Sequence, residues 1–364
     1  MTVTLIENTE ALAQLCAQVQ CSPWIALDTE FTRESTYYAK LGLVQIGTVD
    51  VLACVDPLAV DLTPLLDIIY DPARLKVLHA ARQDLEVLYD IRRALPQPLF
   101  DTQIAAALLG YPDQVGYGAL VESVTGVKLP KLHTRTDWEK RPLSPEQLRY
   151  AEDDVRYLRD VYHSLAADLE RRQRGHWLAQ ECAALTDPAL YRNDPERAYT
   201  RIKGGNALTP QAQPRLRALA SWRERTAQQR DRPRGWILPD ATLIDIARTA
   251  PQDAAALAAQ ALTPRQIESY GADILAALRA AGGEEQIWTE AQPPTPAEQE
   301  LARAMTARVQ AVAQAQAINP TTIATKRSIF ALIREDGGPL TQGWRWEVVG
   351  KELAALAAAV ETRG

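Results

Sequence analysis

The feature that most constrains this 364-residue chain is a short apolar run that ends in two acids. Trp24-Ile25-Ala26-Leu27 is typical of a buried strand, and Asp28-Thr29-Glu30 follows it directly. Because side chains alternate along a strand, Asp28 and Glu30 lie on one face and Thr29 on the other. The pattern predicts two carboxylates that can hold one divalent cation. A surface loop with two solvated acids is the alternative.

A second acid, Asp84, lies in a segment with helical periodicity. Leu85, Leu88 and Ile91 recur at helical spacing, which places Asp84 beside the apolar stripe and near the start of the helix. The helix dipole favours a carboxylate at that position. A first-turn or capping role without chemistry is therefore the alternative interpretation of Asp84.

A third element combines a tyrosine and an acid on one helix. Ser144-Pro145-Glu146-Gln147 has the pattern of a capping box, and the apolar periodicity after it predicts a helix from Gln147 to about Arg174. Tyr150 and Asp154 are four residues apart and so share a helical face. A half-buried tyrosine beside a solvated acid is the alternative for this pair alone.

Taken together, the three elements resemble the exonuclease motifs of the DEDD superfamily in order and approximate spacing. The tyrosine at position 150 points to the DEDDy branch, and further matches point to the ribonuclease D family. These further matches are Arg33-Glu34-Ser35-Thr36-Tyr37-Tyr38, Leu41-Gly42-Leu43-Val44-Gln45-Ile46, Phe100-Asp101-Thr102-Gln103, Thr136-Asp137-Trp138 and Arg141-Pro142-Leu143.

The resemblance implies an α/β N-terminal domain with a ribonuclease H-like mixed sheet. It carries the family's four acids onto Asp28, Glu30, Asp84 and Asp154, and its tyrosine onto Tyr150. These five are the candidate catalytic residues, and the four acids are the candidate ligands of two divalent metal ions, Mg²⁺ or Mn²⁺. Crowded acids raise one another's pKa, and bound cations relieve that repulsion. Tyr150 would orient the attacking water, since an ordinary phenol with a pKa of ~10 is a poor base at neutral pH.

The residues themselves agree with that sheet in outline. Leu43–Thr48 and Val51–Val55 are typical of a hairpin after the first strand, and Leu75–Leu78 of a further strand, with helices in the intervals.

Five further residues are candidates for substrate binding. Phe31 and Tyr37 can stack on terminal bases, although aromatic residues beside a strand are often core. His79 precedes the second motif, where a structural imidazole is the alternative. Lys131 and Arg141 follow loop-like segments and can contact phosphates, with solvated basic side chains as the alternative.

The C-terminal half predicts helical modules. Residues 1–175 form the predicted exonuclease domain and 176–208 a linker rich in turn signals. Residues 209–290 resemble an HRDC domain around Arg230–Asp240, whose arginines and Trp236 can form a nucleic-acid platform. After the Pro-rich break at 292–296, residues 295–364 echo this pattern and predict a second, divergent HRDC-like helical domain.

Composition fits a metal-dependent enzyme better than a general nucleic-acid-binding protein. The net charge is -6 and the hydrophobic content is 46%, enough for ordinary cores. The sequence shows no membrane-spanning run and no signal segment, and its four cysteines lack metal-ligand spacing, so we expect reduced thiols and a cytoplasmic location.

The family resemblance therefore predicts a 3′-to-5′ exoribonuclease that releases nucleoside 5′-monophosphates. Its expected partner is RNA, namely tRNA precursors and other RNA with a free 3′ end, and we expect a monomer. A DNA 3′-to-5′ exonuclease of the proofreading or helicase-associated type and a noncatalytic RNA-binding scaffold remain the alternatives.

Overall fold

The structure of the chain, a computed structural model, describes residues 4–130, 136–283, 285–288 and 293–361. By packing, the chain divides into two compact units. Unit 1 contains Met1–Thr32, Leu41–Leu190 and Pro294–Gly364, and unit 2 contains Arg33–Lys40 and Tyr191–Pro293. Each unit combines stretches that are far apart in sequence, so the units do not correspond to consecutive segments. The predicted division into four consecutive segments therefore stays a prediction. Among the described helices, none is long and apolar enough to cross a membrane.

Unit 1 is built on a six-stranded mixed sheet with the order β1-β4-β3-β2-β5-β6. Strand β3 runs antiparallel to β4, whereas β1 is parallel to β4, and β5 is parallel to both β2 and β6. The predicted mixed sheet is therefore confirmed. The strands are β1 (Thr4–Ile6), β2 (Trp24–Thr32), β3 (Lys40–Gly47), β4 (Leu52–Val55), β5 (Leu75–Leu78) and β6 (Leu99–Asp101).

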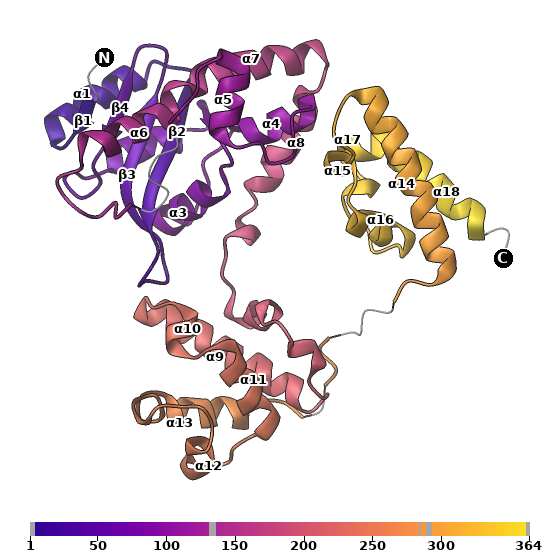
Figure 1. Cartoon of the computed structure of the whole chain (residues 1–364). Helices are drawn as coiled ribbons and strands as arrows, with labels where there is room; N and C mark the ends of the chain where they lie inside the picture. The colour runs from indigo at the N-terminus through magenta and orange to yellow at the C-terminus, as the bar shows by residue number, and fades with distance from the viewer. Residues whose placement is uncertain (1–3, 131–135, 284, 289–292, 362–364) are drawn as a thin grey trace. The chain divides into compact units, whose positions relative to one another are not determined.

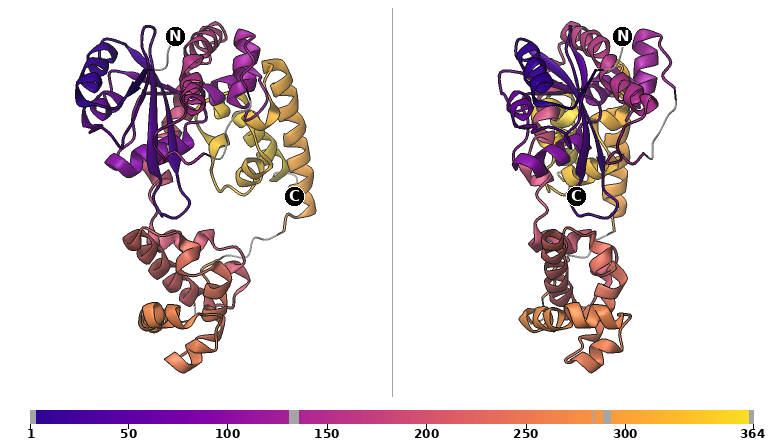
Figure 2. Two further views of the ribbon diagram at one scale, coloured as in Figure 1. Left: turned by 60° about the vertical axis from the view of Figure 1, so that its left-hand side comes forward. Right: turned by 90° about the vertical axis from the view of Figure 1, so that its left-hand side faces the viewer.

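Helices lie on both faces of this sheet (Figure 2). The covering explains the run of four buried residues at Trp24–Leu27, since a strand buried on both faces needs no polar alternation. Helix α6 packs on β4 and β2 (Figure 1). Helix α7 contacts β5, and α8 contacts β6. The helices up to residue 185 are α1 (Thr9–Val19), α2 (Thr63–Ile69), α3 (Arg82–Arg92), α4 (Thr102–Leu109), α5 (Tyr117–Thr125), α6 (Pro145–Arg156), α7 (Leu158–Arg171) and α8 (Gly175–Leu185).

The single helix predicted from Gln147 to about Arg174 is wrong in one respect. It begins as expected with a capping box at Ser144, but α6 ends at Arg156 and α7 begins at Leu158. The apolar periodicity continues through this junction, so the sequence pattern could not reveal it.

The C-terminal helices pack within unit 1. The rings of Trp177 on α8 and Trp344 stack with centroids 4.6 Å apart, and Glu181 forms an ion pair with Arg345. The elements of this C-terminal region are α14 (Pro296–Gln316), α15 (Pro320–Ile323), α16 (Lys326–Ile333), η4 (Pro339–Thr341), α17 (Gly343–Arg345), the π-helical turn η5 (Trp346–Gly350) and α18 (Lys351–Glu361).

Unit 2 is helical. The residues predicted as a linker contain α8 and three 3-10 helices, and Ala198, Ile202 and Leu208 are buried in the core of unit 2. The 3-10 helices are η1 (Pro188–Leu190), η2 (Pro195–Arg201) and η3 (Gly205–Ala207), of which η1 belongs to unit 1. The helices are α9 (Ala212–Arg230), α10 (Arg234–Ile237), α11 (Asp240–Thr249), α12 (Ala254–Ala258) and α13 (Pro264–Ala280).

The turn at residues 33–40, which follows β2 and includes the first residue of β3, is part of unit 2. The Tyr37 ring is buried in its core, and the Tyr37 hydroxyl hydrogen-bonds Glu224. The backbone N–H groups of Tyr37 and Tyr38 both donate to one oxygen of Asp231, at 2.9 and 3.0 Å. The strand that carries the two acids of the first motif therefore continues into a turn that is fixed by α9.

Candidate active site

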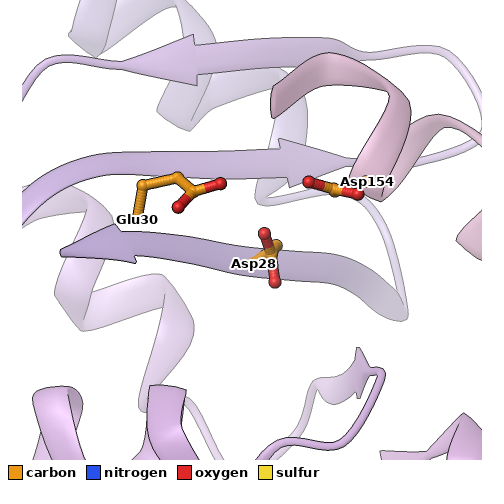
Figure 3. Close-up of side chains that lie close together, drawn as sticks. All are labelled: Asp28, Glu30 and Asp154. Atoms are coloured by element: carbon orange, nitrogen blue, oxygen red, sulfur yellow. The ribbon is translucent and has the colours of Figure 1, made fainter. Parts of the chain in front are cut away.

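Three carboxylates converge in unit 1. Asp28 and Glu30 project from β2 to one side, as strand alternation predicts, and Asp154 on α6 points toward them (Figure 3). One oxygen from each of the three acids lies within 4.8 Å of the other two. Oxygen-only clusters of this kind suit hard divalent cations.

The fourth acid, Asp84, is held by the threonine between the first two. The Thr29 hydroxyl and backbone N–H donate to the same Asp84 oxygen, at 2.5 and 3.1 Å. Thr29 reaches Asp84 because it projects from the opposite face of β2 to Asp28 and Glu30. Asp84 sits in the first turn of α3 and lines the same pocket as the three acids, so the structure brings all four together.

Burial and mutual repulsion oppose ionisation of the four acids. Burial, followed by the charges of Asp154 and Asp84, raises the pKa of Glu30 to about 8. Burial, followed by Asp153, raises the pKa of Asp154 to about 7, and burial raises the pKa of Asp84 to about 6. For Asp28, burial and then the three neighbouring acids hold the pKa well above its usual range. Bound cations would relieve this repulsion, so the donor set fits the predicted metal ions.

Tyr150 lies one turn before Asp154 on α6, as predicted. Its hydroxyl hydrogen-bonds the Asp154 carboxylate, and its ring stacks on Trp138 with centroids 6.2 Å apart. Burial, followed by the charges of Asp154 and Glu30, raises the pKa of Tyr150. The phenol therefore stays protonated at neutral pH and acts as a hydrogen-bond donor.

The four acids and Tyr150 surround a pocket of about 330 Å³. Phe31 and His79, two of the predicted substrate-binding residues, also line it. The His79 Nδ1 atom is 2.9 Å from the Thr102 hydroxyl, which fixes the ring at the pocket wall. The remaining lining residues are Thr29, Ala80, Gln83, Tyr117 and Leu158.

The structure places two other predicted substrate-binding residues outside the pocket. Tyr37 is buried in unit 2, and Arg141 forms a two-pronged ion pair with Asp56 at 2.5 and 2.7 Å. Arg141 also donates to the carbonyl oxygen of Gly42 at 2.8 Å, so its guanidinium makes contacts within the fold. Lys131 lies outside the described residues.

Two residues of the pocket wall, Tyr117 and Gln83, were not among the predicted site residues. Gln83 immediately precedes Asp84, so its position beside the second motif was the available signal. Tyr117 comes from α5, which no motif covered, and nothing in the local sequence marked it.

Comparison with known proteins decides the family. The model of the 3'-5' exonuclease family matches residues 3–170, and that of the HRDC domain matches residues 212–278. The chain is 38% identical to ribonuclease D of Granulibacter bethesdensis over 97% of this chain and 92% of that protein. It is 40% identical to ribonuclease D of Pseudomonas paraeruginosa over 96% of both chains. The chain belongs to the ribonuclease D family.

The structural comparison agrees with membership of the ribonuclease D family. The crystal structure of Escherichia coli RNase D, described as an exoribonuclease involved in structured RNA processing, superposes with a TM-score of 0.86. It is 32% identical in sequence, and the match covers 99% of both chains. The predicted exonuclease fold followed by a helical region with an HRDC domain is confirmed, and so is the activity as a 3′-to-5′ exoribonuclease.

Proposed function

We propose that this ribonuclease D family member shortens RNA one nucleotide at a time and releases nucleoside 5′-monophosphates. The observation that carries the proposal is the convergence of Asp28, Glu30 and Asp154 within 4.8 Å, with Asp84 in the same pocket. We assign these acids as ligands of two divalent ions, Mg²⁺ or Mn²⁺. Bound there, such ions would lower the pKa of a water and neutralise charge on the leaving oxygen.

The side chains around the acids support distinct roles. Tyr150, protonated and hydrogen-bonded to Asp154, orients the attacking water and does not remove its proton. Thr29 fixes one oxygen of Asp84, and the Asp84 carboxylate contributes a ligand at the edge of the cation site. Phe31 offers a ring at the pocket wall on which the terminal base can stack.

Unit 2 would supply RNA contacts beyond the terminal nucleotide. Trp236 is 58% exposed, unusual for a tryptophan, and the Arg232 guanidinium lies 6.0 Å from its ring centroid. An exposed ring beside a cation suits a base and its phosphate. We assign residues 209–290 as the HRDC domain on this basis and on the family match to residues 212–278.

The C-terminal segment, residues 295–364, begins with an order of helices like that of α9 to α11 in unit 2. In each, a long helix ends at a residue with left-handed backbone, Asp231 (φ 46°) or Ala317 (φ 49°). A four-residue helix follows, α10 or α15, and then α11 or α16. This parallel supports a second, divergent HRDC-like domain.

We propose tRNA precursors and other structured RNA with a free 3′ end as substrates, because the related E. coli enzyme processes structured RNA. A monomer in the cytoplasm, where such precursors occur, completes the proposal. The four cysteines, Cys16, Cys21, Cys54 and Cys182, are all free thiols, as a reducing compartment would keep them.

The test is cleavage of a 5′-labelled single-stranded RNA and its DNA counterpart, with Mg²⁺, Mn²⁺ or chelator. We expect a ladder that shortens from the 3′ end of the RNA and is lost with chelator and in Asp28→Asn. The control is Asp50→Asn, an exposed acid after β3, which should cleave as wild type. Cleavage of DNA alone would favour a DNA exonuclease, and binding without cleavage would favour a scaffold.

A further inference from the structure

Tyr117 connects the wall of the active-site pocket to the helix that carries Asp154. It is the first residue of α5, and its ring lines the pocket beside His79, with ring centroids 5.5 Å apart. Its hydroxyl reaches α6 and donates to the backbone carbonyl of Asp153 at 2.9 Å. Asp153 and Asp154 share a peptide bond, so this hydrogen bond acts on the backbone next to a proposed metal ligand.

The hydroxyl of Tyr117 lies where α6 gives way to α7. Tyr157 separates the two helices, with φ -92° and ψ -10°. Carbonyl groups in the last turn of a helix lack regular partners, and side chains can satisfy them. A side chain that enters the hydrogen-bond ladder of a helix is also a recognised cause of kinks. Tyr117 therefore offers a physical reason for the helix boundary that the sequence periodicity did not reveal.

Asp154 requires such a fixed backbone. Its carboxylate must face Asp28 and Glu30, two further acids with an oxygen within 4.8 Å of it. Left to itself, a carboxylate on the last turn of a helix would turn toward water and away from like charges. Residues that orient a metal ligand without contacting the metal commonly contribute a factor of about 10 to 100 to metal affinity.

We propose that Tyr117 is a positioning residue for Asp154, which fixes the last turn of α6 so that the Asp154 carboxylate faces the metal site. The inference rests on the proposed role of Asp154 as a metal ligand. Burial, followed by the charges of Asp154 and Asp28, raises the pKa of Tyr117, while a backbone hydrogen bond from Tyr157 opposes the rise. The phenol thus keeps its proton and remains a donor to Asp153.

The decisive variant is Tyr117→Phe, which keeps the ring in the pocket and removes only the hydroxyl. The matched control is Tyr70→Phe. The Tyr70 hydroxyl is also part-buried and donates to a helix carbonyl, that of Leu88 at 2.7 Å, but Tyr70 does not line the pocket. Both variants lose a hydrogen bond to a helix carbonyl, and Tyr117→Phe also loses the one accepted from the Tyr157 backbone, so a purely structural role predicts a lower melting temperature in each and nothing more.

The measurement is Mn²⁺ binding to the full chain without RNA, by electron paramagnetic resonance, together with kcat and KM on a short RNA. We expect Tyr117→Phe to weaken Mn²⁺ binding by about tenfold and to lower kcat with KM little changed. Amide hydrogen exchange should quicken at residues 154–157. Tyr70→Phe should bind Mn²⁺ as wild type does.

Wild-type Mn²⁺ affinity in Tyr117→Phe, with a melting temperature lowered as in Tyr70→Phe, would overturn the inference. Asp154→Asn separates this from failure of the proposed function. If Asp154→Asn weakens Mn²⁺ binding but Tyr117→Phe does not, Asp154 is a ligand and Tyr117 does not position it. If Asp154→Asn binds as wild type, the proposed metal role of Asp154 is itself wrong.

Discussion

Glu30 should make the metal-free protein less stable as the pH rises toward neutrality. Its pKa is about 8 in the folded protein and 4.5 as an ordinary side chain. Between these values the unfolded chain has released the proton that the folded protein still holds, so the free energy of unfolding falls with increasing pH. From pH 5 to pH 7 the loss from Glu30 amounts to roughly 2 to 3 kcal/mol, since each pKa unit corresponds to about 1.4 kcal/mol.

The perturbation is Glu30→Gln, which keeps the shape of the side chain and removes its ionisation. Thermal unfolding in chelator at pH 5 and pH 7 gives the change in stability of unit 1. We expect the pH-dependent loss to shrink by roughly 2 kcal/mol in the variant, and somewhat more because the neighbouring acids are relieved of one charge. Glu170→Gln, an exposed acid at the end of α7, should keep the wild-type slope.

Saturating Mg²⁺ should stabilise wild type more at pH 7 than at pH 5, because binding requires the ionised carboxylates. Metal-free stability that stays flat or rises from pH 5 to pH 7 would refute the argument from burial and repulsion. So would the same slope in wild type and Glu30→Gln.

Three further outcomes follow from individual contacts. Tyr150→Phe should lower cleavage roughly 10- to 100-fold while RNA affinity in chelator, measured by gel shift, stays at the wild-type value; equal cleavage would remove Tyr150 from the mechanism. Arg141→Ala should cost about 3 kcal/mol of stability in denaturant unfolding, because it leaves Asp56, whose side chain is 3% exposed, without its ion pair; an unchanged midpoint would contradict that assignment. Trp236→Ala should weaken binding of long RNA by about 1 to 3 kcal/mol without changing the melting temperature or cleavage of short oligomers, and unaltered long-RNA binding would place the RNA contacts elsewhere.

The residues of the site could be predicted because local patterns position them. Strand alternation puts Asp28 and Glu30 on one face, and a four-residue helical spacing does the same for Tyr150 and Asp154. The central strands were also predicted, since β2 begins with the apolar run Trp24–Leu27, and β3 and β4 contain short apolar runs. Strands β1 and β6 have three residues each, too few for a periodic signal, and no sequence expectation covered them.

What could not be predicted depends on partners distant in sequence. For Tyr37 the sequence left a base-stacking ring and a core ring as alternatives, and contacts with Glu224 and Asp231, almost 200 residues later, favour the core. For Arg141 the sequence left a phosphate contact and a solvated side chain as alternatives, and it did not indicate the ion pair with Asp56, 85 residues earlier. Charge and residue type identify a side chain that can bind substrate, but only the tertiary contacts show whether it is already occupied.

The turn at residues 33–40 has a practical consequence for dissecting this protein. A shortened chain that stops near residue 175 would keep that turn but lose Glu224, Asp231 and Arg234, which surround Tyr37. Tyr37 would then be an exposed ring on the extension of the strand that bears Asp28 and Glu30. Loss of activity after such a truncation would not measure RNA binding by unit 2, because the truncation also removes the contacts that hold the turn. Point substitutions on the exposed surface of unit 2 in the intact chain would test RNA binding without disturbing the turn.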